Sequence, residues 1–591
     1  MDVGSVTDNI DAVKGPPLAT RRSPQDVTLL SRAIGPLPII NSFLKRLQID
    51  RRLERFVPGH DKRLRLAPAL GIGVLLRNIL IEREPLYALH EWADRFDEPL
   101  LGLPAGAARL LNDDRVGRAL DALFLADRAA LLTDIVVGAV QAFDVDLREL
   151  HNDSTTVTFT GDYAAATGGP IRQRPTHRIT HGHNKDHRPD LKQLLWILTT
   201  SADGAIPVWG STDHGNTADD QTHITTWNTL RRLVGSAHFL YVADAKLCTR
   251  ENMAHIARGE GRFLTILPKT RREDGWFRDW LQDHTPEWVD LGRTQSTRRG
   301  EGGDGVYRGV ESPRRSAEGY RILWIFSSLK ATQDRAARQA RIDRALEELE
   351  RLRRRLGSPK SRLTTRRRIE EAIAAILATG ETHRWIAVTV STENHHQYTQ
   401  AAPGRPGKDT QYVRKTRERF GIRWQMRAET LAYDDRTDGI FPLITNDETL
   451  SLREALAAYK RQPSLEKRHE QLKTVFAVMP VNLKSHSRVE AFLFLYFVAL
   501  LVESLIEREL RRRMKTQNLE SLPLYPEGRR CRAPTAERVF DVFRDVRRHR
   551  LQRADGTVHQ RFYDELTELQ RTVLQLLGYS PKAYFSAGED C

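Results

Sequence analysis

The sequence predicts an α/β protein with a helical N-terminal region and a mixed-sheet core that a long insertion divides in two. Apolar residues recur at three- and four-residue spacing through residues 25–140, as in amphipathic helices. From Leu150 onward the spacing changes to two, as in half-buried strands. Residues 274–436 are rich in arginine, tryptophan and charged helical sequence that such a core does not need, so we interpret them as the insertion.

Length and charge limit the possible functions. A chain of 591 residues has room for about three or four domains and a large catalytic core. Lys and Arg number 92 against 77 Asp and Glu, which gives a net charge of +15 and favours a polyanionic partner such as DNA. Basic composition is also common where arginine replaces lysine in GC-rich genomes. The net charge therefore indicates DNA binding only together with a motif.

Cysteine content and hydropathy indicate a cytoplasmic protein. Cys248, Cys531 and Cys591 are too few and too scattered for a disulfide framework or a thiolate zinc site. Residues 1–24 are polar, are expected to be flexible, and lack the order of a signal peptide. The longest apolar stretch, residues 491–502, is shorter than the roughly twenty residues that span a bilayer. We therefore expect a buried core helix, no membrane partner and a place near the nucleoid.

The N-terminal domain, residues 25–140, is predicted to be wholly helical. Its helical periodicity is clearest in residues 39–47, 69–81 and 116–124, and Asn112 to Asp114 supply cap residues before the last of these. Short helices joined by tight turns suit a DNA-binding domain of the helix-turn-helix type. A helical bundle used for docking or dimerisation fits equally well.

The first part of the core, residues 145–273, reads as a three-stranded meander followed by alternating strands and a helix. Thr155, Val157 and Phe159 alternate with polar residues, and the strands 192–200 and 205–209 are joined by a turn at Asp203 and Gly204. Further strands are predicted at 239–243 and 263–267, with a helix at 252–257 between them. This order is typical of an RNase H-like core, although other mixed α/β folds share it.

The insertion, residues 274–436, is predicted to hold strands and a charged helical pair within residues 328–378. The helices span residues 338–356 and 363–377 and either project into solvent or lie along DNA. Strands are expected at 385–390, 411–416 and 424–432. The second part of the core, 437–515, begins with a strand at 439–445 and a helix at 452–459, and residues 516–591 form a helical C-terminal region.

Two aspartates stand where a metal-dependent nuclease would need them. Asp153 lies on the first core strand, and Asp244 directly follows the apolar strand 239–243, at a sheet edge where ligands collect. Asp213 and Asp220 are rival acids that end no apolar strand. Two magnesium ions, for which manganese can substitute, would be held by such carboxylates during cleavage of a phosphodiester.

A spaced signature supplies the third acid. Tyr459, Arg461, Glu466 and Lys473 resemble the tyrosine, arginine, glutamate and lysine signature of a group of bacterial DDE transposases within the superfamily related to insertion sequence four. The spacing of the tyrosine, the glutamate and the lysine matches at each step. Gln462 occupies the arginine position, and Arg461 is adjacent to it. Pro463 predicts a kink or a helix start just before Glu466.

The resemblance extends over roughly residues 30–510, and its blocks are most similar to transposases of insertion-sequence family sixteen-thirty-four. The blocks include residues 153–161, 184–193, the region of Asp244, Asp438-Gly439 and the N-terminal run from residue 34 to residue 115. The resemblance implies an RNase H-like core with Asp153, Asp244 and Glu466 as catalytic and metal-binding residues. It also implies DNA contacts by Tyr459, Lys473 and, in place of the missing arginine, Arg461.

The block at 184–193 adds Lys185 and Arg188, which we expect to contact DNA phosphate. His177, His181, His183 and His187 crowd the segment that leads into this block, and a zinc site there is the less favoured alternative. Trp276, Trp280, Trp385 and Trp424 in the insertion either stack on an unpaired base or, more simply, fill a small core.

The function indicated by the whole sequence is that of an insertion-sequence transposase. It would bind the terminal inverted repeats of its element, cut double-stranded DNA and join the 3′-hydroxyl ends to target DNA, acting as a homodimer because two ends must be cut together. Two alternatives remain open at this stage: an RNase H-like nuclease without strand transfer, and an inactive DNA-binding relic.

Overall fold

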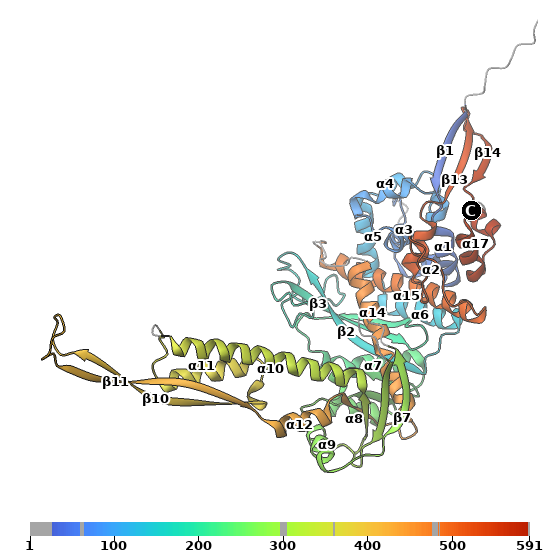
Figure 1. The fold of residues 1–591 in the computed structure, drawn as a ribbon. Coiled ribbons are helices and arrows are strands. Elements are labelled where there is room, and N and C mark those ends of the chain that lie inside the picture. Colours follow the sequence, from blue (N-terminus) through green and yellow to red (C-terminus); the bar gives the residue numbers. More distant parts are fainter. Residues whose placement is uncertain are drawn as a thin grey trace, which may run out of the picture. The chain divides into compact units, whose positions relative to one another are not determined.

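The structure is a computed structural model that describes residues 27–59, 64–295, 304–358, 361–475, 483 and 485–588 (Figure 1). The expected flexible segment 1–24 lies outside these residues. The chain is a mixed α/β protein that forms two compact units. Unit 1 comprises the described residues of 1–144, 160–176 and 471–591, and unit 2 comprises 145–159 and 177–470.

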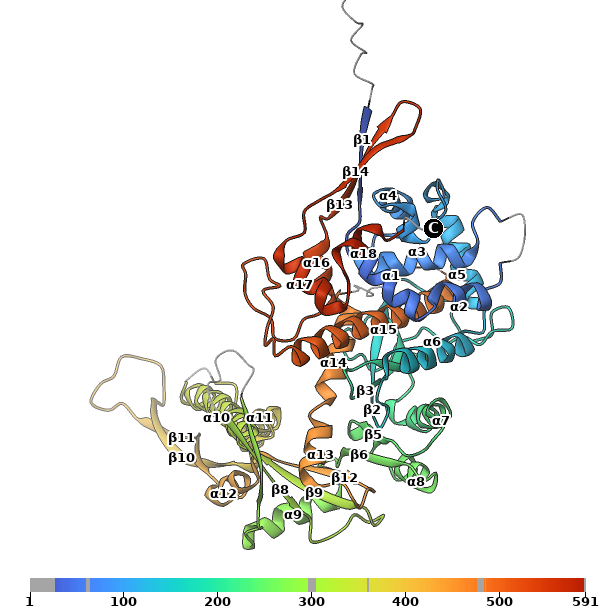
Figure 2. The same ribbon diagram turned by 90° about the vertical axis from the view of Figure 1, so that its right-hand side faces the viewer.

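Unit 1 is built around one long helix, α15 (His486–Thr516). The helices α1 (Leu37–Arg46), α3 (Pro68–Ile81), α5 (Asp113–Leu125), α16 (Ala536–Phe543) and α17 (Glu568–Leu577) contact it (Figure 2). The remaining helices are α2 (Ile49–Phe56), α4 (Leu89–Asp94), α6 (Arg128–Phe143) and α18 (Pro581–Ser586). The predicted cap at Asn112 is confirmed, because its side chain accepts a hydrogen bond from the Arg115 backbone N–H.

Helix α15 is the buried core helix that the apolar stretch predicts. By length and composition it could cross a membrane, but 94% of its apolar window is buried inside the structure. Its buried Glu490 pairs with Arg128 of α6 at 2.9 Å, which compensates the cost of burying a carboxylate. The sequence predicts that residues 437–515 form the second part of the core, whereas α15 within them packs with the N-terminal helices of unit 1.

The N-terminal region is not wholly helical, which corrects the prediction for residues 25–140. Strand β1 (Val27–Ala33) pairs antiparallel with β13 (Arg547–Arg553), which pairs in turn with β14 (Val558–Tyr563). The prediction of a helical C-terminal region over residues 516–591 is also wrong in part, because β13 and β14 lie within it before α17 begins. The partner of β1 lies more than 500 residues along the chain, so no local pattern identifies the pairing.

Unit 2 is organised on a nine-stranded mixed sheet in the order β4-β3-β2-β5-β6-β12-β9-β8-β7. Strands β2 (Glu149–Phe159), β3 (Lys192–Ser201) and β4 (Pro207–Asp213) form the predicted antiparallel meander. Strand β5 (Leu240–Ala243) is parallel to β2, and β6 (Arg262–Ile266) is parallel to β5. Helix α7 (His223–Val234) lies between β4 and β5 along the chain, and α8 (Arg250–Arg258) lies between β5 and β6.

Part of the predicted insertion belongs to this sheet. Strands β7 (Val289–Gln295), β8 (Asp304–Glu311) and β9 (Arg321–Ser327) extend it antiparallel beyond β12 (Ile440–Thr445). The predicted boundary at residue 274 falls inside helix α9 (Arg272–Asp283). Because β9 is buried and pairs with β12 on one side and β8 on the other, these strands complete the sheet rather than forming a separate domain.

The rest of the insertion is an arm of two helices and two strands. Helices α10 (Ser328–Gly357) and α11 (Arg366–Thr379) confirm the charged helical pair. Strands β10 (Ile386–Gln400) and β11 (Tyr412–Met426) pair along their full lengths. The predicted strand 424–432 is wrong, because β11 ends at Met426 and helix α12 (Ala428–Thr437) follows. Ile342, Leu349, Ile369 and Ile373 of the helices pack against Ile422 of the ribbon in one apolar cluster.

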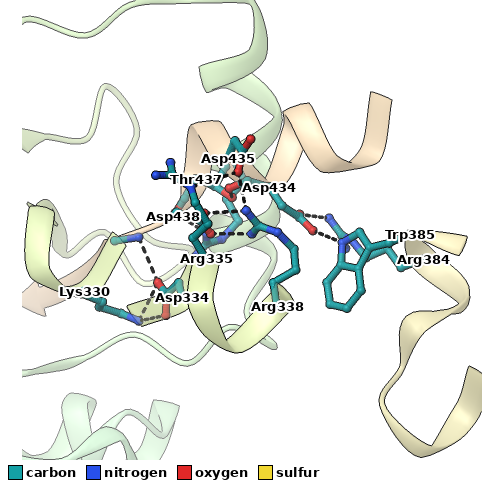
Figure 3. Close-up of polar contacts among 12 residues, drawn as sticks. Lys330, Asp334, Arg335, Arg338, Arg384, Trp385, Asp434, Asp435, Thr437 and Asp438 are labelled. Atoms are coloured by element: carbon teal, nitrogen blue, oxygen red, sulfur yellow. Dashed lines mark hydrogen bonds and ion pairs between the residues drawn. The ribbon is translucent and has the colours of Figure 1, made fainter. Parts of the chain in front are cut away.

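A buried ion pair joins the base of the arm to the sheet (Figure 3). Arg338 of α10 donates to both carboxylate oxygens of Asp438 at 2.8 Å, and both side chains are buried. Asp434 accepts hydrogen bonds from the Trp385 indole N–H at 2.6 Å and from Arg384 at 2.5 Å. Gly439 has a φ of +78°, and a Cβ there would lie 2.5 Å from the Ser327 carbonyl oxygen, so this position requires glycine.

Candidate active site

Asp153 and Asp244 lie on neighbouring parallel strands of unit 2. Strand β2 carries Asp153, and the pairing of Asn152 with Ala243 puts Asp244 beside it, directly after β5 ends. Asp244 caps the following turn by accepting a hydrogen bond from the Lys246 backbone N–H at 3.0 Å. The structure therefore brings together these two of the predicted catalytic acids.

The two carboxyl groups share an acidic environment. Burial raises the pKa of Asp153 to about 6; Lys185 lowers it, whereas Asp244 and then Asp219 raise it. Burial also raises the pKa of Asp244, where Lys246 and Lys185 oppose the effect and Asp219 adds to it. Burial and the repulsion between the acids therefore raise both pKa values more than the nearby lysines lower them.

Lys185 is the cation inside this group. Its ammonium lies 2.9 Å from Asp219 and 3.8 Å from Asp153, and it donates hydrogen bonds to the backbone and hydroxyl oxygens of Ser154. Lys185 was predicted to contact DNA phosphate, and in the structure it lies among the site's carboxylates. Its four oxygen neighbours indicate a role in holding these acids together.

Glu466 lies on helix α14 (Gln462–Glu470), which begins at the position that Pro463 predicts. Gln462, Leu465 and His469 form the buried face of this helix, whereas Glu466 is exposed. The His469 Nε2 lies 3.7 Å from the Asp153 carboxylate. Because residues three apart are neighbours on a helix surface, Glu466 is adjacent to the residue that touches Asp153.

Tyr459 is a half-buried residue on which the charges of both Glu466 and Asp244 act. It ends helix α13 (Leu452–Tyr459), packs against the core cluster of the sheet, and its ring lies 5.6 Å from that of Phe441. Burial raises the pKa of its hydroxyl, and the charges of Glu466 and Asp244 raise it further. Both acids are therefore close enough to this side chain to act on it electrostatically.

Arg461 is bound to a carboxylate rather than open to solvent. Its guanidinium donates two hydrogen bonds to Glu149 of β2, at 2.6 and 2.5 Å. Gln462, which stands at the signature's arginine position, is buried and contacts His151 at 2.9 Å and the Asn152 backbone oxygen at 3.3 Å. These contacts fix the start of α14 on the strand that carries Asp153.

Arg188 and Lys473 are the other predicted DNA contacts. Arg188 donates two hydrogen bonds to Asp190, at 2.9 and 2.8 Å, and both side chains are exposed. Lys473 lies in a π-helical turn, Gln471–Val475, that belongs to unit 1. Their contacts with DNA remain predictions.

The chemistry of the side chains suits a hard divalent cation, because Asp153, Asp219 and Asp244 all offer carboxylate oxygens. One of these aspartates lies on a strand and the other two lie in turns. Among the described residues, however, no three His, Cys, Asp or Glu side chains form a group that could hold a metal ion. Asp153 and Asp244, both half-buried, are the two acids of the predicted triad that the strand pairing brings side by side. The same finding gives no support to a zinc site among the histidines of residues 177–187.

Asp219 and His469 are site residues that the sequence reasoning missed. Asp219 comes from a turn (Asp219–Gln221) before α7, next to Asp220, which had been considered as a rival ligand. No local pattern separates these two acids, because their difference lies in the ion pair with Lys185. His469 could have been found, since helical periodicity from Gln462 and Leu465 puts it on the buried face.

Comparisons with known proteins add two findings. A family model described as a domain of unknown function (DUF4277) matches residues 30–137, whereas no curated protein matches the chain. A cryo-EM structure of the piggyBac transposase synaptic complex with hairpin DNA is similar over 79% of this chain and 74% of that chain. The sequence identity is 9% and the TM-score is 0.35, which is too low to establish a shared fold.

Proposed function

We propose that this chain is a DDE transposase that cuts DNA at the ends of a mobile element and joins the freed 3′-hydroxyl groups to target DNA. The observation that carries the proposal is the position of Asp153 and Asp244, side by side on parallel strands β2 and β5. Strands β4-β3-β2-β5-β6 form a meander followed by two parallel strands, which is the order proposed for an RNase H-like core.

Asp153 and Asp244 are the residues that would hold magnesium, with Glu466 as the third ligand. Magnesium bound there would supply charge stabilisation to the attacking and leaving oxygens of the phosphodiester. The proximity of the half-buried Asp153 and Asp244 supports this role, because holding like charges together costs free energy unless a cation lies between them. Mn²⁺ is expected to substitute for Mg²⁺ because both prefer oxygen ligands.

The chain's own residues orient this site. Lys185 pairs with Asp219 and Asp153 and limits the repulsion between acids before DNA binds. Arg461, through its two hydrogen bonds to Glu149, holds the helix that carries Glu466 against β2. We assign Arg461 as a positioning residue, and keep Tyr459 and Lys473 as the proposed contacts to the DNA end.

The test is strand transfer by the purified full chain. The protein is incubated with Mg²⁺ and a duplex that carries the ends of the neighbouring element, beside the variants Asp153→Asn, Asp244→Asn and Glu466→Gln. The control variant is Asp213→Asn, which changes an acid at the end of β4 outside the proposed triad. We expect joined product from the wild type and the control, and none from the three site variants.

Each other outcome contradicts part of the proposal. Cleavage without joining would indicate a nuclease, and binding without cleavage would indicate an inactive relic. Strand transfer by the Asp153→Asn variant would show that Asp153 and its neighbours are not the catalytic site. Sequencing the genomic flanks adds an independent check, because a transposase gene should lie between inverted repeats.

A further inference from the structure

The ribbon of β10 and β11 is a separate element of unit 2 that the proposed catalytic site does not use. Its two strands pair over 15 residues each and, within the described chain, have no third strand beside them. At about 3.3 Å per residue the ribbon is roughly 50 Å long. Figure 1 shows it continuing past helices α10 and α11.

Only the base of the ribbon is supported by other elements. One face carries Ile386, Val388, Val390, Phe420 and Ile422, which pack against α10 and α11. None of residues 392–418 belongs to that apolar cluster, and nearly all of them are exposed. A paired ribbon that leaves its supporting helices in this way presents both faces and both edges to a partner.

The opposite face is basic along its length. Side chains alternate on a strand, so Lys415, Arg417, Arg419 and Arg423 all lie on the face away from the helices. All four are exposed, and the residues paired with them are polar, with Glu393 opposite Arg419 as the single acid. We call these four residues the basic row.

The four cations of the basic row form no ion pairs within the described residues. The arginines of the helical pair differ, because Arg351, Arg366 and Arg367 pair with Glu348, Glu370 and Glu371 within their own helices.

The sign of the charge identifies the kind of partner. Protecting the open edges of a ribbon from aggregation needs charge of either sign. Residues 386–426 instead carry seven Lys and Arg against three Asp and Glu, and the seven include Arg405 and Lys408 of the loop between the strands. An extended row of unpaired cations is complementary to a polyanion that is itself regular and long.

We infer that the β10–β11 ribbon binds duplex DNA by lying in the major groove, with the basic row against phosphates. The major groove of B-DNA is about 12 Å wide and admits a two-stranded ribbon. The choice of DNA as the polyanion rests on the proposed function. The exposed Tyr398 and Tyr412 on the other face are available for contacts to sugars and base edges.

The test measures DNA affinity of the full chain in EDTA, where cleavage cannot occur, by fluorescence anisotropy across a series of salt concentrations. The variant carries Lys415→Ala, Arg417→Ala, Arg419→Ala and Arg423→Ala. Each lost phosphate contact reduces the slope of log K against log salt by about 0.9. We expect a slope reduced by about 3 to 4 and an affinity at least about tenfold lower near 0.15 M salt.

The matched control replaces four exposed arginines of the helical pair, Arg351, Arg354, Arg366 and Arg367, by alanine and removes the same charge. Its salt slope should stay close to that of the wild type. Equal losses in both variants would mean that general charge, not the ribbon, sets the affinity, and unchanged binding by the basic-row variant would overturn the inference. Circular dichroism confirms that both variants fold.

Two further outcomes separate other partners from DNA. Duplex RNA has a deep, narrow major groove, so equal affinity for it would overturn placement in that groove. A change in oligomeric state of the basic-row variant, without a change in DNA affinity, would assign the ribbon to a second copy of the chain. Because Asp153→Asn should leave binding in EDTA intact, failure of the proposed catalysis can be distinguished from failure of this inference.

Discussion

Among single residues, Lys185 is the cation that offsets the repulsion between the acids of the site. Its ammonium is shared by Asp219 and Asp153, and it lowers the pKa of both Asp153 and Asp244 against the effect of burial. A divalent ion at the aspartates would replace part of this compensation, which frees the lysine for a phosphate. The DNA contact predicted for Lys185 and its observed ion pairs are therefore compatible as two states of one side chain.

The Glu149–Arg461 pair gives a pH-dependent prediction. Burial raises the pKa of Glu149, but hydrogen bonds from His151 and Arg461 outweigh it and lower the value from 4.5 to about 2. A lowered folded-state pKa stabilises the protein above the unfolded value, and this contribution disappears as the pH falls through 4.5 toward 2. Glu149→Gln should thus reduce the free energy of unfolding by about 1.5 to 3 kcal/mol at pH 7, and by less at pH 3.

Urea unfolding at several pH values measures this effect. Glu448→Gln, which breaks an exposed pair with Arg315, is the control and should change stability little. A loss in Glu149→Gln that is the same at pH 7 and pH 3 would contradict the ion-pair explanation.

The sequence was sufficient for part of the site because part of it is local. Strand alternation and a strand end were enough to bring Asp153 and Asp244 together, whereas the role of Glu466 stays a prediction from spacing. Asp219 could not, because its contact with Lys185 depends on a turn between β4 and α7 meeting the loop before β3. Gln462 in place of the expected arginine is explained only by its buried contacts with His151 and Asn152.

At the scale of elements, strands with a nearby partner were predictable and strands with a distant partner were not. The meander β2 to β4 has a turn signal at Asp203-Gly204, and alternation marks β2. Strands β7 to β9 were predicted to belong to the insertion, because β12, the core strand that pairs with β9, follows the entire arm in the sequence. The arm was correctly predicted as a charged helical pair, but its anchor at Asp438 and Gly439 needed the structure.

The anchor of the arm gives a stability prediction. Arg338→Ala leaves Asp438 buried without its partner, and removing one member of a buried pair typically costs about 3 to 5 kcal/mol. Arg335→Ala, one helical turn earlier, removes an exposed arginine that lies 3.6 Å from Asp435, and should cost less than about 1 kcal/mol. Equal losses of unfolding free energy in urea would show that the Arg338–Asp438 pair does not anchor the arm.

At the scale of the whole molecule, two compact units divide the chain in a way that linear order conceals. Unit 1 collects three segments of the chain, because α15 buries its apolar surface against the N-terminal helices. Unit 2 carries both the sheet with its acids and the arm with its basic row. The net charge of +15 is therefore distributed unevenly within unit 2. This unit contains both the half-buried acidic site and the basic row of the ribbon.

A last prediction concerns how the acidic site affects the stability of the complete chain. Two half-buried carboxylates that repel each other destabilise the metal-free protein, so Asp153→Asn should raise Tm in EDTA. A ligand that binds only the folded state stabilises it in proportion to RT ln(1 + [L]/Kd), so Mg²⁺ should raise the wild-type Tm progressively with concentration. The same Mg²⁺ series should have little effect on Asp153→Asn, whereas the Asp213→Asn control should respond as the wild type does. Differential scanning calorimetry in Mg²⁺ and in matched ionic strength without it measures all three proteins. If Asp153→Asn lowers Tm in EDTA, the aspartate has a structural role that outweighs repulsion, and a Mg²⁺ response that survives the substitution would place the ion elsewhere in the molecule.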